Sequence, residues 1–164
     1  MIVIALGANL PSHAGAPRET LKAALCELSH HGVHIAQVSS VYITKAWPDP
    51  SDPLFVNAVA RVETSLPPVE LMALLHRTEE YFGRTRSIRN APRSLDLDLI
   101  DYDGRVEQGP PVLPHPRLAE RAFVLVPLSE IAPEWHHPVT GEKISGLIAA
   151  LPLAAREEMG QGKS

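Results

Sequence analysis

Hydrophobic and polar positions follow two different spacings in the first part of the chain. Residues 2–6 are a continuous apolar run that ends at Gly7, and such a run is typical of a strand buried on both faces. Residues 17–30 instead repeat leucine and alanine three and four positions apart, which predicts an amphipathic helix. Pro17 favours the start of this helix and Gly32 favours its end. A strand and then a helix are therefore expected.

The next elements are separated by proline and glycine. Residues 33–43 are rich in β-branched side chains and predict a second strand, and the alternating residues 55–63 predict a third. Between these two strands, residues 45–53 contain three prolines, so this segment is expected to be an irregular loop. A second amphipathic helix should follow the prolines at 67–68 and end at Gly83.

The order of these elements predicts the fold. Residues 95–100 alternate again and complete the order strand–helix–strand–strand–helix–strand. This is the order of the ferredoxin-like α+β arrangement (βαββαβ), an antiparallel sheet with its helices packed on one face, and we expect the ligand site on the other face. Residues 1–164 should form a single domain with short helical pieces after residue 110. Residues 154–164 should fray, because they lack apolar periodicity.

The composition is that of an ordinary globular domain. A chain of 164 residues can bury about 70% of its unfolded surface, and 45% of the residues are hydrophobic. The net charge of −4 gives no overall field that would attract nucleic acid or an anionic membrane, and no apolar run is long enough for a membrane span. Cys26 is the only cysteine, so no disulfide can form within the chain. We expect a cytoplasmic protein that works as a monomer.

Asp96 and Asp98 are the strongest candidates for chemistry. In a strand they share one face, while the leucines beside them share the other. Two carboxylates about 6.6 Å apart along a strand can hold a hard cation such as Mg²⁺ against a phosphate-bearing ligand. Four arginines lie just upstream: Arg84, Arg86, Arg89 and Arg93. Together these groups indicate phosphoryl transfer, although a D-x-D pair taken alone is more often a solvated strand face.

Several blocks of sequence carry a resemblance to a known family. They are ALGANL at 5–10, FVNA at 55–58, GRTR at 83–86, RNAPRSLDLDLI at 89–100, PHPR at 114–117, RAFVLVPL at 121–128 and EIAP at 130–133. In order and spacing, the chain resembles the 6-hydroxymethyl-7,8-dihydropterin pyrophosphokinase family, which moves a pyrophosphoryl group from ATP to a pterin alcohol in folate biosynthesis. The block that ends in the two aspartates is the specific signature of that family.

The resemblance implies a catalytic site for phosphoryl transfer. Asp96 and Asp98 would bind two Mg²⁺ ions between the ATP phosphates and the acceptor hydroxyl, and Arg84 and Arg93 would act with them in catalysis. Contacts with ATP would come from Glu79, Arg86, Leu99, His115 and Arg121. The resemblance alone implies that attack falls on the β-phosphorus, so that AMP rather than ADP would leave.

The resemblance also implies a pterin site. Phe55 and Phe123 fall where the two stacking rings of the family stand, and Asn57 can both donate to and accept from the amide-like edge of a pterin. The remaining contacts would come from Gly7, Thr44, Lys45 and Trp47. Without the resemblance, both phenylalanines would be interpreted as core residues. The chain departs from many relatives at Lys45, where proline is common, at Asn90, where tryptophan is common, and at Pro116, where tyrosine is found.

Two alternatives from other functional classes stay open. The same arrangement of sheet and helices occurs in RNA-binding modules, and strong retention on heparin would favour that function. The second alternative is a relative that has lost activity, against which the intact acidic and basic residues argue. The resemblance implies small-molecule partners, ATP and the pterin, and neither nucleic acid nor membrane.

Overall fold

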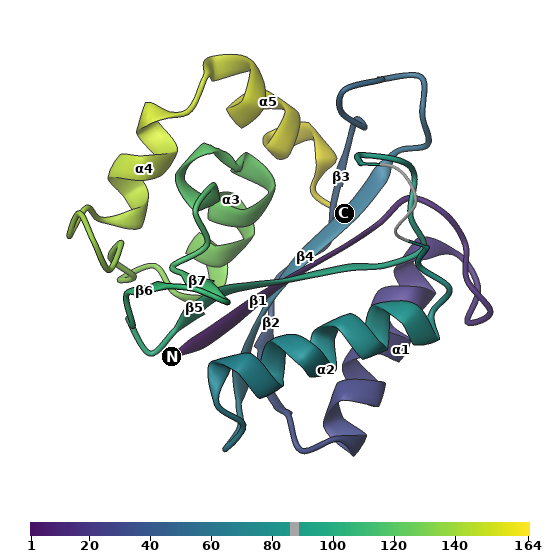
Figure 1. Ribbon diagram of the computed structural model, residues 1–164. Helices are drawn as coiled ribbons and strands as arrows, with labels where there is room; N and C mark the ends of the chain where they lie inside the picture. Colours follow the sequence, from purple (N-terminus) through teal and green to yellow (C-terminus); the bar gives the residue numbers. More distant parts are fainter. Residues whose placement is uncertain (86–88) are drawn as a thin grey trace.

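The computed structural model describes residues 1–85 and 89–164. The elements in the first two thirds of the chain are β1 (Ile2–Ala8), α1 (Pro17–His30), β2 (His34–Val38), β3 (Tyr42–Thr44), β4 (Phe55–Glu63), α2 (Pro68–Tyr81) and β5 (Asp96–Tyr102). The remaining elements are β6 (Glu107–Gln108), β7 (Val112–Leu113), the 3₁₀ turn η1 (Leu118–Glu120), α3 (Ala122–Ile131), α4 (Ile144–Ala150) and α5 (Leu153–Gly162). Figure 1 shows these elements along the chain.

An antiparallel sheet carries the fold. Within the described residues its strand order is β2-β4-β1-β5, and β3 pairs with the other end of β4. The central strand β1 is buried along its whole length, as its apolar run predicted. Its register sets Gly7 opposite Asn57 of β4 on one side and opposite Asp96 of β5 on the other. The sheet therefore brings three residues that are far apart in sequence into one row.

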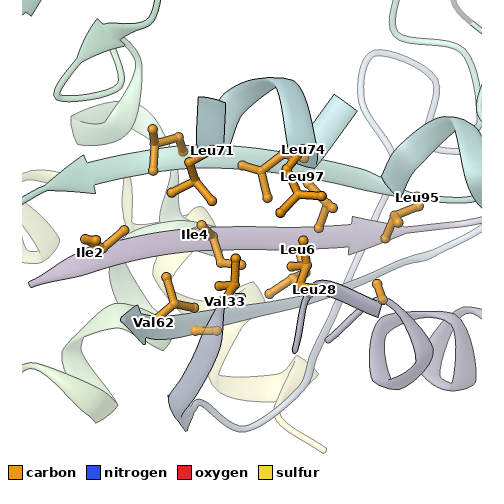
Figure 2. Close-up of a cluster of buried hydrophobic side chains, with 14 of the residues drawn as sticks. Ile2, Ile4, Leu6, Leu28, Val33, Val62, Leu71, Leu74, Leu95 and Leu97 are labelled. Carbon is orange, nitrogen blue, oxygen red and sulfur yellow. The ribbon is translucent and has the colours of Figure 1, made fainter. Parts of the chain in front are cut away.

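Helices α1 and α2 cover one face of this sheet, as the ferredoxin-like order predicted (Figure 1). Both helices begin at a proline, where the missing N–H is one that the helix would not have used. Figure 2 shows Ile4 and Leu6 of β1 beneath Leu71 and Leu74 of α2. Fully burying one such side chain contributes about 1.5–3 kcal/mol, so this layer is a main source of stability.

The opposite face of the sheet, where the ligand site was expected, is covered by helices over part of its length and is free for ligands only at one end. Helices α3, α4 and α5 pack over it (Figure 1), and Val3 and Val59 of the sheet share a buried cluster with Leu125 and Leu128 of α3. The α3 sequence AFVLVPLSEI is almost entirely apolar, so this helix has to be buried on nearly all sides. The candidate site is therefore confined to one end of the sheet.

Two expectations from the sequence are wrong. The segment 33–43 is not one strand: Ser39 separates β2 from β3, and its hydroxyl accepts the N–H of Val59 at 3.0 Å. The tail 154–164 does not fray, since α5 runs through it and buries Met159. One apolar anchor and a set of polar contacts hold this helix, so hydrophobic periodicity could not reveal it.

None of the helices in the described residues has the length and hydrophobicity needed to cross a membrane.

Candidate active site

A pocket of about 300 Å³ opens at the end of the sheet where β1, β4 and β5 lie side by side. Its lining contains all seven residues that the resemblance assigned to pterin binding: Gly7, Thr44, Lys45, Trp47, Phe55, Asn57 and Phe123. The same lining includes Asp96 and Asp98 together with Arg93 and Arg121. The fold thus gathers residues from opposite ends of the sequence around one cavity.

Asn57 forms the polar floor of this pocket. Its side chain is buried, and its Nδ2 donates to the hydroxyl of Thr44 at 3.0 Å, which ties β4 to β3. A Cβ at Gly7 would stand 3.4 Å from Asn57 Oδ1 and 3.7 Å from the Phe55 ring. Glycine at this position therefore leaves space beside the amide and the ring that a side chain would fill.

The two carboxylates are held by cationic side chains. Arg84 donates to Asp96 Oδ1 at 2.7 Å, and Arg93 donates to Asp96 Oδ2 at 3.2 Å. Arg121 donates to Asp98 Oδ2 at 2.8 Å. The Asp96 and Asp98 side chains keep 27% and 26% of their surface exposed, so a ligand in the pocket can reach both.

A second pocket, of about 400 Å³, lies behind the same carboxylates. Its lining includes His76, Glu79, Arg84 and Arg89, and it shares Asn90, Arg93, Asp96 and Asp98 with the first pocket. Both pockets contain arginines, and the first pocket adds the rings of Phe55 and Phe123 and the amide of Asn57. The two aspartates stand in the wall between them.

Glu79 contacts two of the residues that hold the aspartates in place, Arg84 and Leu97. Its carboxylate is buried, pairs with Arg84 and accepts the backbone N–H of Leu97 at 2.8 Å. It therefore links α2 to β5 and holds the arginine that contacts Asp96. The resemblance assigned Glu79 to ATP; in the structure it lines the second pocket, and its carboxylate is engaged by Arg84 and the N–H of Leu97.

His115 stands at the edge of the site, 4.0 Å from Asp98 Oδ2. Burial lowers the pKa of His115, and Arg121 and Arg117 lower it further against the opposing effect of Asp98. Its Nδ1 accepts the N–H of Arg117 at 3.1 Å. Its Nε2 lies 3.5 Å from Arg121 Nη1 and therefore stands between the Arg121 guanidinium and Asp98 Oδ2.

One residue assigned to ATP, Leu99, is not brought to the site. Leu99 is buried in the core between the sheet and the first two helices and lines neither pocket, because it shares the strand face of Leu97 rather than that of Asp98. Arg86 lies outside the described residues.

Sequence reasoning did not assign Asn9 to the site, although the residue belongs to the block 5–10. Its side chain is buried; its Oδ1 accepts the N–H of Arg93 at 2.8 Å and its Nδ2 donates to the carbonyl of Pro53 at 3.1 Å. Asn9 thereby joins the arginine segment to the loop 45–53. A polar amide directly after a buried strand was the signal that could have revealed it.

Five more residues line the first pocket without having been assigned a role: Ala5, Leu6, Asn90, Arg117 and Glu120. Asn90 adopts a left-handed backbone with φ of 60°, a conformation that asparagine tolerates better than most residues. This backbone gives a physical reason for asparagine at position 90.

Comparison with known proteins identifies the family. A sequence model of the 7,8-dihydro-6-hydroxymethylpterin-pyrophosphokinase (HPPK) family matches residues 3–133. The chain belongs to this family. The HPPK match runs from β1 to the end of α3 and includes both aspartates, and residues 134–164, with α4 and α5, lie beyond it.

Individual relatives agree with this assignment. A 2-amino-4-hydroxy-6-hydroxymethyldihydropteridine pyrophosphokinase from Synechocystis is 39% identical over 96% of this chain and 83% of its own length. The enzyme of the same name from Pseudomonas aeruginosa is 35% identical and is covered over 96% of both chains. A Plasmodium falciparum HPPK-DHPS crystal structure with pteroate has a TM-score of 0.66 at 12% identity over 90% of this chain and 43% of that one. The last match bears on the fold alone, and it agrees with the α+β HPPK fold.

Proposed function

We propose that this protein transfers the pyrophosphoryl group of ATP to 6-hydroxymethyl-7,8-dihydropterin and releases AMP and the pterin diphosphate, a step of folate biosynthesis. One observation carries the proposal: Asp96 and Asp98 line two neighbouring pockets that both contain arginines, and the first of these also holds the rings of Phe55 and Phe123 and the amide of Asn57. A planar acceptor in the first pocket and a triphosphate in the second would meet at these carboxylates. Membership of the HPPK family supports this choice of substrates.

The donor set fits Mg²⁺. Magnesium usually takes one or two protein carboxylates and completes its shell with phosphate oxygens and water. In the described part of the chain no cluster of three or more histidine, cysteine or acidic side chains could hold a metal by itself, so Asp96 and Asp98 would depend on the nucleotide for the remaining ligands. When bound, two Mg²⁺ ions would neutralise phosphate charge and lower the pKa of the acceptor hydroxyl.

The arginines have a defined task in this proposal. In the free protein, Arg84 and Arg93 neutralise Asp96, and Arg121 neutralises Asp98. With a cation bound to the carboxylates, the guanidinium groups would become available to phosphate oxygens, which match their paired donors. Phosphoryl transfer spreads negative charge over those oxygens, so donors already held in place lower the barrier.

Identification of the nucleotide product tests the proposal. The protein is incubated with ATP, Mg²⁺ and 6-hydroxymethyl-7,8-dihydropterin, and the nucleotides are separated by ion-exchange chromatography. AMP that forms only when the pterin is present is the expected result. ADP in place of AMP would contradict the proposed site of attack, and the absence of both products would contradict the proposed reaction.

A further inference from the structure

The C-terminal helix α5 and the residues that follow it contact strand β3 directly. Lys163 forms a β-bridge with Tyr42, and the N–H of Ser164 donates to the carbonyl of Val41 at 2.9 Å. Figure 1 shows the end of the chain beside β3. The last residues therefore lie along the outer edge of a strand that lines the first pocket at Thr44.

Gly162 makes the closest of these approaches. A Cβ at Gly162 would overlap the carbonyl oxygen of Ile43 and stand 3.1 Å from its carbonyl carbon, and both atoms belong to the backbone of β3. A Cβ at Gly160, in the same helix, would meet no atom within 4 Å. Neither glycine has a positive φ, so the overlap with β3 is the difference between the two positions.

Glu158 adds a polar contact to Lys45, the residue that follows β3. Its Oε1 accepts the backbone N–H of Lys45 at 2.7 Å. Lys45 lines the first pocket and follows Thr44, whose hydroxyl accepts from Asn57. A single chain of contacts thus runs from α5 through Lys45 and Thr44 to the amide at the floor of the pocket.

Lys163 fastens the end of α5 to helix α3. Its ammonium group lies 2.6 Å from Glu130 Oε1, and the other oxygen of Glu130 accepts the N–H of Ser40 at 2.8 Å. The Tyr42 hydroxyl donates to the same carboxylate, so β3 and the C-terminal segment share one anchor. The position of β3 is therefore fixed from α3 and α5 together.

We propose that α5 positions the wall formed by Thr44 and Lys45 and thereby sets the affinity for the pterin, with Glu158 and Gly162 as positioning residues. This inference rests on the proposed function, in which that wall contacts the pterin. It assigns a role to residues outside the range that the family model matches. In the described part of the chain, Arg84 and Arg93 of the second pocket pair with Glu79 and Asp96 rather than with α5, so the effect of α5 should fall on the pterin rather than on ATP.

Matched variants test this role. Gly162→Ala is compared with Gly160→Ala, and Glu158→Ala with Glu157→Ala, an exposed neighbour in the same helix. KM for the pterin, KM for ATP, kcat and Tm are measured for each. We expect KM for the pterin to rise about fivefold or more in Gly162→Ala and about threefold in Glu158→Ala, with KM for ATP unchanged. Glu158→Gln retains an acceptor oxygen and should restore most of the affinity.

The outcomes separate this inference from the proposed function. Wild-type protein that forms AMP, together with Gly162→Ala and Glu158→Ala proteins that keep the wild-type KM for the pterin, would overturn this inference alone. Wild-type protein that forms no AMP would overturn both. Should Gly162→Ala fail to fold, Glu158→Ala carries the test, because it removes a contact without creating an overlap. Equal rises in both KM values would indicate general loosening and overturn the assignment.

Discussion

Asn9 and Arg93 bind each other reciprocally: the N–H of Arg93 donates to Asn9 Oδ1 at 2.8 Å, and the N–H of Asn9 donates to the carbonyl of Arg93 at 3.0 Å. The pair fixes the segment before β5 against the end of β1. Asn9→Ala should lower the free energy of unfolding by about 1–3 kcal/mol, because it removes the partner of a backbone N–H in a partly buried contact.

The same substitution should lower kcat about tenfold or more, since Arg93 would no longer be held beside Asp96. Asn9→Asp is the comparison variant, because it keeps the acceptor for Arg93 while it replaces the donor to Pro53 with a charged oxygen. Urea denaturation and steady-state kinetics measure both effects. An Asn9→Ala protein with wild-type kcat would show that the pair serves stability alone.

Asp98 should be indispensable for the reaction and dispensable for the fold. Asp98→Ala removes one of the two carboxylates between the pockets, and we expect AMP formation to fall below detection. The change in Tm should be small, because the side chain is partly exposed and lies on the strand face opposite the leucine core. Glu63→Gln, at the far end of β4, is the control. Near-normal AMP formation by Asp98→Ala would refute the assignment of Asp98.

Removal of divalent metal should abolish activity without unfolding the protein. In the described residues the carboxylates are neutralised by Arg84, Arg93 and Arg121, so the metal-free site carries no uncompensated pair of negative charges. EDTA should therefore stop AMP formation and leave Tm unchanged, and Mg²⁺ should restore activity. Mg²⁺ and ATP together should raise Tm, since a ligand that binds only the folded state stabilises it. Full activity in EDTA would contradict the role of the aspartates as metal ligands.

Glu130 should make stability depend on acid pH. Burial alone would raise its pKa, but hydrogen bonds from Lys163, Tyr42 and Ser40 outweigh this effect and lower the pKa from the ordinary 4.5 to about 2. The folded protein then binds fewer protons than the unfolded chain between these values. The stabilisation is fully present above about pH 4.5 and is lost as the pH falls towards 2.

Glu130→Gln should flatten this pH dependence. We expect the variant to be less stable than the wild type at pH 7 and to lose less stability between pH 4.5 and 2. Urea unfolding at a series of pH values measures the difference, and Glu134→Gln, an exposed residue nearby, is the control. Parallel pH profiles for the wild type and Glu130→Gln would contradict the role of this carboxylate.

Sequence patterns correctly predicted the helices and strands that are determined by residues close together in the sequence. The helix expected at 17–30 matches α1, since its leucine spacing and its first proline both act within the helix. The alternation around Asp96 correctly placed both carboxylates on the face opposite the leucines. Elements that depend on distant partners were missed: the break at Ser39 follows from pairing with Val59, and α5 is held by contacts with β3 and α3.

The candidate site shows the same division. The residues around the first pocket were found through the family resemblance of several sequence blocks. The chemistry of a single residue does not indicate which distant residues lie beside it in the fold. Leu99 was assigned to ATP although its place in the alternation puts its side chain in the core. Asn9 was missed because its partners lie 44 and 84 residues away, and no local pattern reports such contacts.

The pairing of β1 with both neighbours has a consequence for the choice of acceptor. Asn57 and Asp96 are each paired with Gly7, so their Cα atoms are separated by two interstrand spacings, about 9.5 Å. Backbone hydrogen bonds alone maintain this span between the amide that would recognise a ring and the carboxylate that would hold a cation. Exchanging side chains around the pocket leaves the span unchanged. Only a shift of β4 relative to β5 along β1 would change the span, so an acceptor with a longer arm would require a different strand register rather than different side chains around the pocket.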